Sequence, residues 1–206
     1  METPRDAAGR AAGRRERGLV RFQLTGLDGV FVIDLERRED HRGYFARAFC
    51  GTEFDAHGLN PVVAQANVAR STHKGTVRGM HFQYPPHAEA KLVRATRGTI
   101  LDVAVDLRPE SPTYLRHVAV ELTADDQRAL YVPERFAHGY QTLEDGTDVL
   151  YLTSVPYAPD FDAGLSPFDP RLGISWPLRA TEVSAKDTGA RPLSEIGDEL
   201  KRRMAM

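Results

Sequence analysis

The chain has 206 residues, of which 41% are apolar and 27% are charged, a balance typical of an ordinary globular domain. Its net charge of -2 provides no general attraction for nucleic acid or for an anionic membrane, so neither partner is expected. No apolar run approaches the roughly 20 residues of a membrane-spanning helix. The single cysteine, Cys50, excludes a disulfide within the chain and favours a reducing, cytoplasmic compartment.

Residues 1–18 differ in character from the rest of the chain. They are rich in Ala, Gly and Arg and contain no aromatic residue. Because such a segment buries too little apolar surface to offset the loss of backbone entropy, we expect a disordered tail. An Arg-rich organelle-targeting peptide is the alternative, although the serines typical of such peptides are missing. Residues 19–206 are then expected to form one domain, because no linker divides them.

From residue 19 onward the pattern predicts β-structure. Short runs of β-branched and apolar residues recur at fairly regular intervals, separated by Gly, Pro, Asp or Asn. The clearest are residues 30–35, 62–68, 92–96, 99–107, 117–122 and 149–153. No long stretch with helical periodicity lies between them, so the sequence favours a sandwich or barrel over alternating strands and helices.

One clear helix is expected near the end of the chain. Ser194 is expected to cap it, and Ile196, Leu200 and Met204 fall on one face. Three basic residues at 201–203 suit the C-terminal end of a helix. A short helical turn is also expected at residues 52–57, and the rest of the domain is predicted to be all-β.

Two histidines, His81 and His138, each stand in an aromatic-flanked, strand-like run, at residues 78–83 and 136–140. A metal-binding barrel usually supplies a second His or a Glu close by, but Phe82 and Gln83 follow His81. Because imidazole titrates near neutral pH, two inward-facing histidines without such a ligand set indicate proton transfer.

Many strand positions carry polar side chains. If these faced solvent, they would need no explanation. If they faced inward, each would cost about 1–3 kcal/mol without a partner, and together they would indicate a ligand cavity. Their mixture with glycine and aromatic residues favours the cavity. The positions are Gln65, Asn67, Arg78, His81, Gln83, Lys91, Asp102, Asp106, His138 and Tyr151.

This polar set contains the groups that proton abstraction next to a carbonyl requires. A carboxylate would orient His81 as the base, and Asp169 in a distant Phe-Asp-Pro loop is the candidate. Lys91 or His138 could stabilise an enolate oxygen, and Tyr151 could return a proton as an acid. Taken alone, a packed tyrosine and a surface lysine are the plainer interpretations of Tyr151 and Lys91.

Two arginines stand beside glycine, Arg42 before Gly43 and Arg78 before Gly79. The forked donors of arginine suit phosphate oxygens, and a neighbouring glycine lets a ligand approach the backbone, although surface turns also contain such pairs. The chain has no phosphate-binding loop, no dinucleotide fingerprint and no serine nucleophile elbow, so ATP use, Rossmann-type cofactor binding and serine hydrolysis lack support.

Together these motifs resemble the dTDP-4-dehydrorhamnose 3,5-epimerases, cofactor-free enzymes with a cupin-like jelly roll, a double-sheet β-barrel. The resemblance covers about residues 26–193. The matching stretches are residues 40–45, 65–67, 75–83, 91–93, 102–108, 111–114, 136–140 and 172–177. It implies epimerisation of a dTDP-4-keto-6-deoxyhexose at C3, C5 or both in deoxysugar biosynthesis, with no metal or organic cofactor, by a homodimer.

The resemblance also implies roles for individual residues. His81 would abstract protons beside the C4 ketone with Asp169 behind it, and Tyr151 would be the acid. Lys91 and His138 resemble the residues near the sugar oxygen. Nucleotide and sugar contacts are implied for Arg42, Phe45, Gln65, Asn67, Arg78 and Tyr157, the last by stacking on the nucleobase.

The chain departs from the family pattern at four positions: Arg47 replaces Glu, Ala69 replaces Ser, Arg135 replaces Gly and Tyr140 replaces Phe. None of these changes removes a catalytic group, but they leave open the sugar and the choice between C3 and C5. The alternatives are a single-site epimerase or 3,4-ketoisomerase on the same scaffold, or a non-catalytic sugar-nucleotide-binding module. The retention of a base and an acid together argues against the module.

Overall fold

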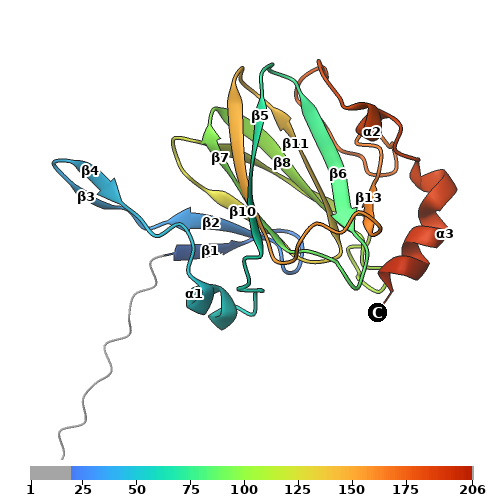
Figure 1. Ribbon diagram of the computed structural model, residues 1–206, viewed down its shortest axis with the longest axis horizontal. Coiled ribbons are helices and arrows are strands. Elements are labelled where there is room, and N and C mark those ends of the chain that lie inside the picture. The colour runs from blue at the N-terminus through green and yellow to red at the C-terminus, as the bar shows by residue number, and fades with distance from the viewer. Residues whose placement is uncertain (1–19, 206) are drawn as a thin grey trace, which may run out of the picture.

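The computed structural model describes residues 20–205, and the tail predicted at residues 1–18 lies outside them. Two antiparallel sheets pack face to face, and a smaller hairpin projects from one end (Figure 1). The first sheet has the order β1-β2-β10-β7-β12-β5. Its strands are β1 (Val20–Leu24), β2 (Phe31–Leu35), β10 (Ala129–Val132), β7 (Lys91–Arg97), β12 (Thr147–Thr153) and β5 (Gln65–Ser71).

The second sheet has the order β13-β6-β11-β8-β9. Its strands are β13 (Asp162–Gly164), β6 (Val77–Gln83), β11 (Phe136–Thr142), β8 (Thr99–Asp106) and β9 (His117–Thr123). The projecting hairpin pairs β3 (Arg38–Asp40) with β4 (Gly43–Phe45). This architecture is the predicted cupin-like jelly roll, and the six strand runs expected from the sequence correspond to β2, β5, β7, β8, β9 and β12.

The central strands β8, β10 and β11 are buried on both faces, which explains why their runs read as continuous, whereas β5 and β9 keep exposed positions. Apolar side chains from the two sheets meet between them, among them Val93, Ala104, Leu130 and Phe136. The outer face of the second sheet is covered by the C-terminal segment, and that of the first by α1 (Gly51–Ala56), whose Phe54 is fully buried. The short helical turn predicted at residues 52–57 is therefore confirmed.

The C-terminal helix α3 spans Leu193–Met204 and buries Ile196, Leu200 and Met204, as its periodicity predicts. The expected cap was wrong. Ser194 lies inside the helix, Pro192 precedes its first turn, and the amide of Leu193 donates to Oδ2 of Asp169 at 2.6 Å. A carboxylate from a distant loop thus accepts a backbone N–H of the first helical turn that has no partner within the helix.

A further short helix, α2 (Ala185–Thr188), was not expected from the sequence. Ser184 caps it by accepting a hydrogen bond from the amide of Asp187 at 3.0 Å. Within residues 20–205, no helix is long and apolar enough to cross a membrane.

Strands β6 and β11 approach each other unusually closely at two glycines. Gly79 has a φ of +120°, and a Cβ there would lie 2.5 Å from the Cα of Gly139. The strand register shifts between His138 and Tyr140, where Gly139 lies, while His138 and His81 are direct cross-strand partners. The two glycines therefore allow the contact that sets the two predicted histidines side by side.

Arg135 stands where the family pattern has a glycine, and the turn before β11 is nevertheless retained. Arg135 itself adopts a φ of +64°, a conformation that costs most side chains about 1–2 kcal/mol. Its guanidinium forms two hydrogen bonds with Glu110, at 2.6 and 2.8 Å. This forked ion pair fixes the strained residue against the neighbouring loop.

Candidate active site

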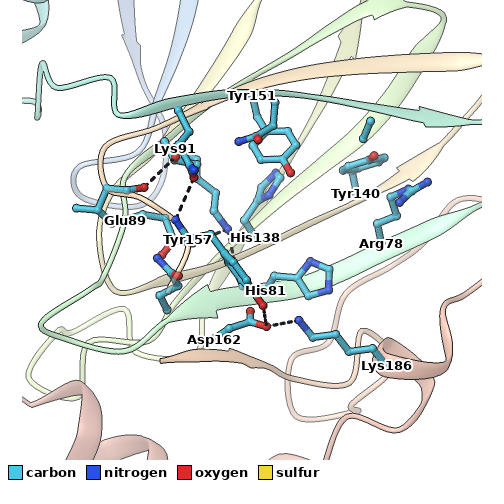
Figure 2. A pocket seen from close by; sticks show the side chains of 16 residues that line it. Arg78, His81, Glu89, Lys91, His138, Tyr140, Tyr151, Tyr157, Asp162 and Lys186 are labelled. Carbon is cyan, nitrogen blue, oxygen red and sulfur yellow. Dashed lines mark hydrogen bonds and ion pairs between the residues drawn. The ribbon is translucent and has the colours of Figure 1, made fainter. Parts of the chain in front are cut away.

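A cavity of about 450 Å³ opens between the two sheets (Figure 2). This volume is within the usual range for small-molecule sites. The first sheet contributes Gln65, Asn67, Lys91 and Tyr151, the second contributes Arg78, His81 and His138, and Tyr157 follows from the loop after β12. The predicted polar cavity therefore exists, and eight of the predicted site residues line it.

His81 is paired with a buried carboxylate at the wall of this cavity. Its Nε2 lies 2.6 Å from Oδ1 of Asp187, which α2 places beneath β6. The amide of Gly79 donates to the other oxygen of Asp187 at 3.2 Å. Burial by itself would raise the pKa of Asp187, but the hydrogen bonds from His81, Gly79 and Ser184 outweigh it and lower that pKa. An ionised carboxylate that accepts Nε2–H leaves Nδ1 of His81 as the nitrogen able to accept a proton.

The predicted pairing of His81 with Asp169 was wrong. Asp169 is buried, but its oxygens accept hydrogen bonds from the amides of Arg171 and Leu193. It therefore stabilises its own loop and the start of α3. The sequence offered a signal for the correct partner, since Ser184 followed three residues later by an acid is a helix-start pattern. That pattern predicts a helix but cannot show that Asp187 meets a histidine in another part of the chain.

His138 has a carboxylate partner of its own. Its Nε2 lies 2.7 Å from Oδ1 of Asp102, which is completely buried on the neighbouring strand β8. Asp102 was noted in the sequence as a polar strand residue but received no role. The second sheet thus presents two histidines side by side, each held by a carboxylate.

Lys91 enters the cavity from the first sheet. Its Nζ lies 3.0 Å from Oε1 of Glu89 and donates to the carbonyl oxygen of His81 at 3.3 Å. Both side chains of this ion pair are nearly buried, and both residues line the cavity. Lys91 is therefore not a surface lysine, and its ammonium is held within reach of whatever occupies the space beside His81.

Two tyrosines line the cavity in different ways. Tyr151 projects from β12 into the cavity, toward the wall formed by the second sheet, which carries His81 and His138 (Figure 2). Tyr140, on β11, has a buried hydroxyl that makes no hydrogen bond of normal geometry among residues 20–205. Burial raises the pKa of Tyr140 to about 12, although Arg78 and Ser71 partly oppose this increase. Tyr151 is thus the phenol presented to a ligand.

The mouth of the cavity carries charged and aromatic groups. The exposed Tyr157 donates from its hydroxyl to Asp162 at 3.1 Å, and Lys186, next to Asp187, also contacts Asp162 (Figure 2). Arg78 donates to Oγ of Ser71 at 3.1 Å and to the carbonyl of Arg70 at 2.9 Å. Asp162 and Lys186 were not predicted from the sequence.

Two predicted substrate contacts do not reach this cavity within the chain. Arg42 and Phe45 belong to the projecting β3–β4 hairpin, where Arg42 pairs with Asp40 at 2.6 Å and Phe45 is 64% exposed (Figure 1). Arg47, which replaces the Glu of the family pattern, also lies outside the cavity lining and pairs with Glu53 at 3.4 Å.

No group of three or more His, Cys, Asp or Glu side chains within residues 20–205 is arranged to hold a metal ion. The cavity instead offers a carboxylate-backed histidine, a tyrosine on the facing sheet and an ammonium between them. A jelly roll with this set of groups defines the class of acid–base isomerases that move a proton next to a carbonyl.

Comparison with known proteins identifies the family. The family model described as dTDP-4-dehydrorhamnose 3,5-epimerase matches residues 24–195. A dTDP-4-dehydrorhamnose 3,5-epimerase of Sinorhizobium fredii is 42% identical over 176 residues, covering 85% of this chain and 90% of the relative. The chain therefore belongs to the dTDP-4-dehydrorhamnose 3,5-epimerase family, and the predicted enzyme class, an isomerase of the epimerase type, is confirmed.

Solved structures agree with this assignment. NovW, a 4-keto-6-deoxy sugar epimerase from the novobiocin gene cluster of Streptomyces spheroides, superposes with a TM-score of 0.83 at 37% identity, covering 88% of this chain and 92% of its own. An epimerase of Legionella pneumophila in complex with dTDP-4-keto-L-rhamnose gives a TM-score of 0.82 at 33% identity, covering 88% and 96%. The predicted fold class is confirmed by both.

Proposed function

We propose that this chain epimerises a dTDP-4-keto-6-deoxyhexose at C3, C5 or both, for deoxysugar biosynthesis. The observation that carries the proposal is the His81–Asp187 pair on one sheet, with Tyr151 facing it from the other sheet across a cavity. An epimerase must remove a proton from one face of a carbon and return one to the other face. Groups on two opposed sheets suit that task. The relatives' names supply the substrate class.

In the first step, His81 takes a proton from a carbon beside the C4 ketone. Asp187 accepts Nε2–H of His81 at 2.6 Å and stabilises the imidazolium that forms once Nδ1 takes the proton. Charge then develops on the C4 oxygen as an enolate, and the Lys91 ammonium stabilises it electrostatically. No step of this route requires a metal or an organic cofactor.

In the second step, Tyr151 delivers its hydroxyl proton to the opposite face of the same carbon, which inverts the configuration. The phenolate then regains a proton, and His81 loses the one it took, so the net exchange is with solvent. Around the sugar, Gln65, Asn67 and Arg78 provide amide and guanidinium donors. Tyr157, at the cavity mouth, provides a ring on which a nucleobase can stack.

The test is proton NMR of dTDP-4-keto-6-deoxyglucose incubated with the protein in deuterium oxide. We expect deuterium at C3 and C5 together with new stereoisomers. Exchange at one carbon alone would make the chain a single-site epimerase, and migration of the ketone would make it a 3,4-ketoisomerase. Tight binding without any exchange would overturn the enzymatic proposal in favour of a sugar-nucleotide-binding module.

The division of labour between the two sheets predicts an unusual result for Tyr151→Phe. Without the acid, His81 still removes a proton and returns deuterium to the same face, so deuterium enters the sugar but no inverted product accumulates. Tyr140→Phe is the matched control, because that hydroxyl is buried in the cavity wall, and its removal should leave inversion intact. Inversion by Tyr151→Phe at the wild-type rate would contradict the assignment of the acid.

We also infer that the protein is a homodimer in which each copy lends its β3–β4 hairpin to the partner's cavity. Arg42 and Phe45 have no role in their own chain's cavity, and the hairpin projects away from the sandwich (Figure 1). Other exposed apolar side chains, Leu24 on β1 and Val68 on β5, lie on the edge strands of the first sheet. Such exposed apolar surface suits a partner, and the resemblance supports two copies.

Complementation tests the shared site. His81→Ala and Phe45→Ala homodimers should each be weakly active. In a mixed dimer, the cavity with an intact His81 would receive an intact Phe45 from the other copy, so unfolding and refolding the two variants together should restore activity. A monomer in sedimentation experiments, or no recovery on mixing, would contradict the inference.

The free thiol of Cys50 supports a reducing, cytoplasmic setting for the proposed function.

A further inference from the structure

The side-chain amide of Gln83 binds the backbone of two different loops. Gln83 is the last residue of β6, is 4% exposed and lines the cavity. Its Oε1 accepts a hydrogen bond from the amide of Ala158 at 2.5 Å, and its Nε2 donates to the carbonyl oxygens of His87 at 2.9 Å and Pro156 at 3.4 Å. Both N–H groups of the side chain are thus engaged. This glutamine therefore joins the end of β6 to the loop that follows it and to the loop that follows β12.

The segment that Gln83 holds carries Tyr157. Residues 156–158 belong to no strand or helix. The amide of Tyr157 donates to Oε1 of Gln65 at 3.0 Å, so the successive backbone N–H groups of Tyr157 and Ala158 both bind glutamine side chains. Gln65 is exposed on the edge strand β5, where water competes for its hydrogen bonds, whereas Gln83 is buried. Because a buried hydrogen bond is the costlier one to break, Gln83 is the firmer of the two attachments.

The other end of the Tyr157 side chain is anchored at the same level of the second sheet. Its hydroxyl donates to Oδ2 of Asp162 at 3.1 Å (Figure 2). Asp162 on β13 is the direct cross-strand partner of Gln83 on β6. One pair of facing residues therefore fixes both the backbone beside Tyr157 and its hydroxyl, while the side chain itself remains 59% exposed at the cavity mouth.

We propose that Gln83 is a positioning residue that holds the Tyr157 ring in place to stack on the nucleobase of the substrate. This inference rests on the proposed function. A stacking surface that is ordered before the ligand arrives spares the complex the entropy cost of ordering it. Gln83 acts on nucleotide binding and not on the chemical step, because His81 and Tyr151 are positioned by the pairing of their own strands.

Gln83→Leu tests the proposal, because leucine keeps roughly the size of the side chain and removes its hydrogen bonds. We expect the Kd for dTDP, measured by calorimetry, to rise about 10-fold, the upper range of the cost of immobilising one side chain, while kcat changes less than about threefold. Unchanged dTDP binding in Gln83→Leu, or a loss confined to kcat, would overturn the proposal.

A double-mutant cycle shows whether Gln83 acts through Tyr157. Tyr157→Ala alone should weaken dTDP binding about 10- to 100-fold, the contribution of an aromatic side chain stacked on a base. Adding Gln83→Leu to Tyr157→Ala should then change the Kd less than about twofold, because the ring that Gln83 positions is gone. Equal weakening by Gln83→Leu in both backgrounds would overturn the proposal.

Gln141→Leu is the matched control. Gln141 is completely buried on β11 and also binds a loop with its side-chain amide, since it donates to the carbonyl oxygen of Leu178 and accepts the amide of Leu178, both at 3.0 Å. It is not part of the cavity lining. Gln141→Leu should therefore lose stability and bind dTDP as the wild type does. An equal loss of dTDP binding in both glutamine variants would show a general effect of lost stability and overturn the proposal.

Amide hydrogen exchange supplies a readout that needs neither a ligand nor a folded variant. In the wild-type protein, the Ala158 amide should exchange as slowly as the amides of β6, although it lies in a loop. A rapidly exchanging Ala158 amide would overturn the inference. A protected Ala158 amide and the predicted binding losses, in a protein that binds dTDP but exchanges no substrate proton, would support the positioning role and contradict the proposed function instead.

Discussion

At the residue scale, the identity of the carboxylate behind His81 has the largest consequence for the chemistry. Asp187 and Asp169 are both buried aspartates near the C-terminus, and both accept backbone amides. Only Asp187 contacts a histidine. A carboxylate in that position orients the ring and stabilises the imidazolium, whereas one that holds a helix end affects only stability.

Asp187→Asn should therefore lower kcat by about 100- to 1000-fold with little change in KM, since acid–base groups contribute factors of that size. Asp169→Asn should leave kcat near the wild-type value and reduce the free energy of unfolding by about 1 kcal/mol through the weakened start of α3. Steady-state kinetics and urea unfolding of both variants make the comparison. The opposite pattern, a loss of kcat in Asp169→Asn alone, would restore the pairing inferred from the sequence.

Residue types and motif spacing were sufficient to predict that His81, His138, Lys91 and Tyr151 line a polar cavity. Their partners could not be predicted in the same way. Asp187 and Asp102 meet their histidines across 106 and 36 residues of sequence, and sequence periodicity does not encode which carboxylate meets which histidine. Asp169 was chosen for its loop, whereas in the structure its Oδ2 accepts the first backbone amide of α3.

At the element scale, β6 and β11 determine how closely His81 and His138 approach. Gly79→Ala would place a Cβ 2.5 Å from the backbone of Gly139 at a φ of +120°. We expect a loss of at least about 3 kcal/mol in the free energy of unfolding, from conformational strain and overpacking together. Gly58→Ala measures the cost of conformational strain without overpacking. Gly58 also has a positive φ, +70°, but a Cβ there would meet nothing within 4 Å.

The Gly58→Ala change should thus cost only about 1–2 kcal/mol, measured by the same denaturant titration. Equal costs for the two variants would show that the close approach of β6 and β11 adds nothing to the requirement for glycine.

The longer strands could be predicted because apolar β-branched runs bounded by turn residues are strong local signals. The short elements could not. β3, β4 and β13 have three residues each, and α2 has four, too few for periodicity to identify. α2 is the element that carries Asp187, so the shortest helix among the described residues positions the carboxylate that contacts His81.

At the scale of the whole molecule, several buried carboxylates make the stability depend on pH. Burial alone would raise the pKa of Asp106, but hydrogen bonds from Arg108, Ser111 and Thr113 outweigh it and lower that pKa. A carboxylate with a lowered pKa in the folded state contributes stability above the ordinary value near 4, and the contribution is lost as pH falls further. Asp187 behaves in the same way.

The free energy of unfolding should accordingly fall between pH 5 and pH 3. In Asp106→Asn it should be lower at pH 7 and should fall less over that interval, because one of the titrating carboxylates is gone. Urea unfolding at pH 7, 5 and 3 provides the values. A variant whose stability falls as steeply as that of the wild type would show that Asp106 does not contribute to the acid transition.

The most direct test of the central claim, that His81 is the base of a nucleotide-sugar epimerase, compares the wild type with His81→Ala. The measurement is the rate at which deuterium enters C3 and C5 of dTDP-4-keto-6-deoxyglucose in deuterium oxide, with dTDP binding followed by calorimetry. We predict that His81→Ala binds dTDP as the wild type does and loses deuterium entry at both carbons. Exchange at the wild-type rate in His81→Ala would contradict the account.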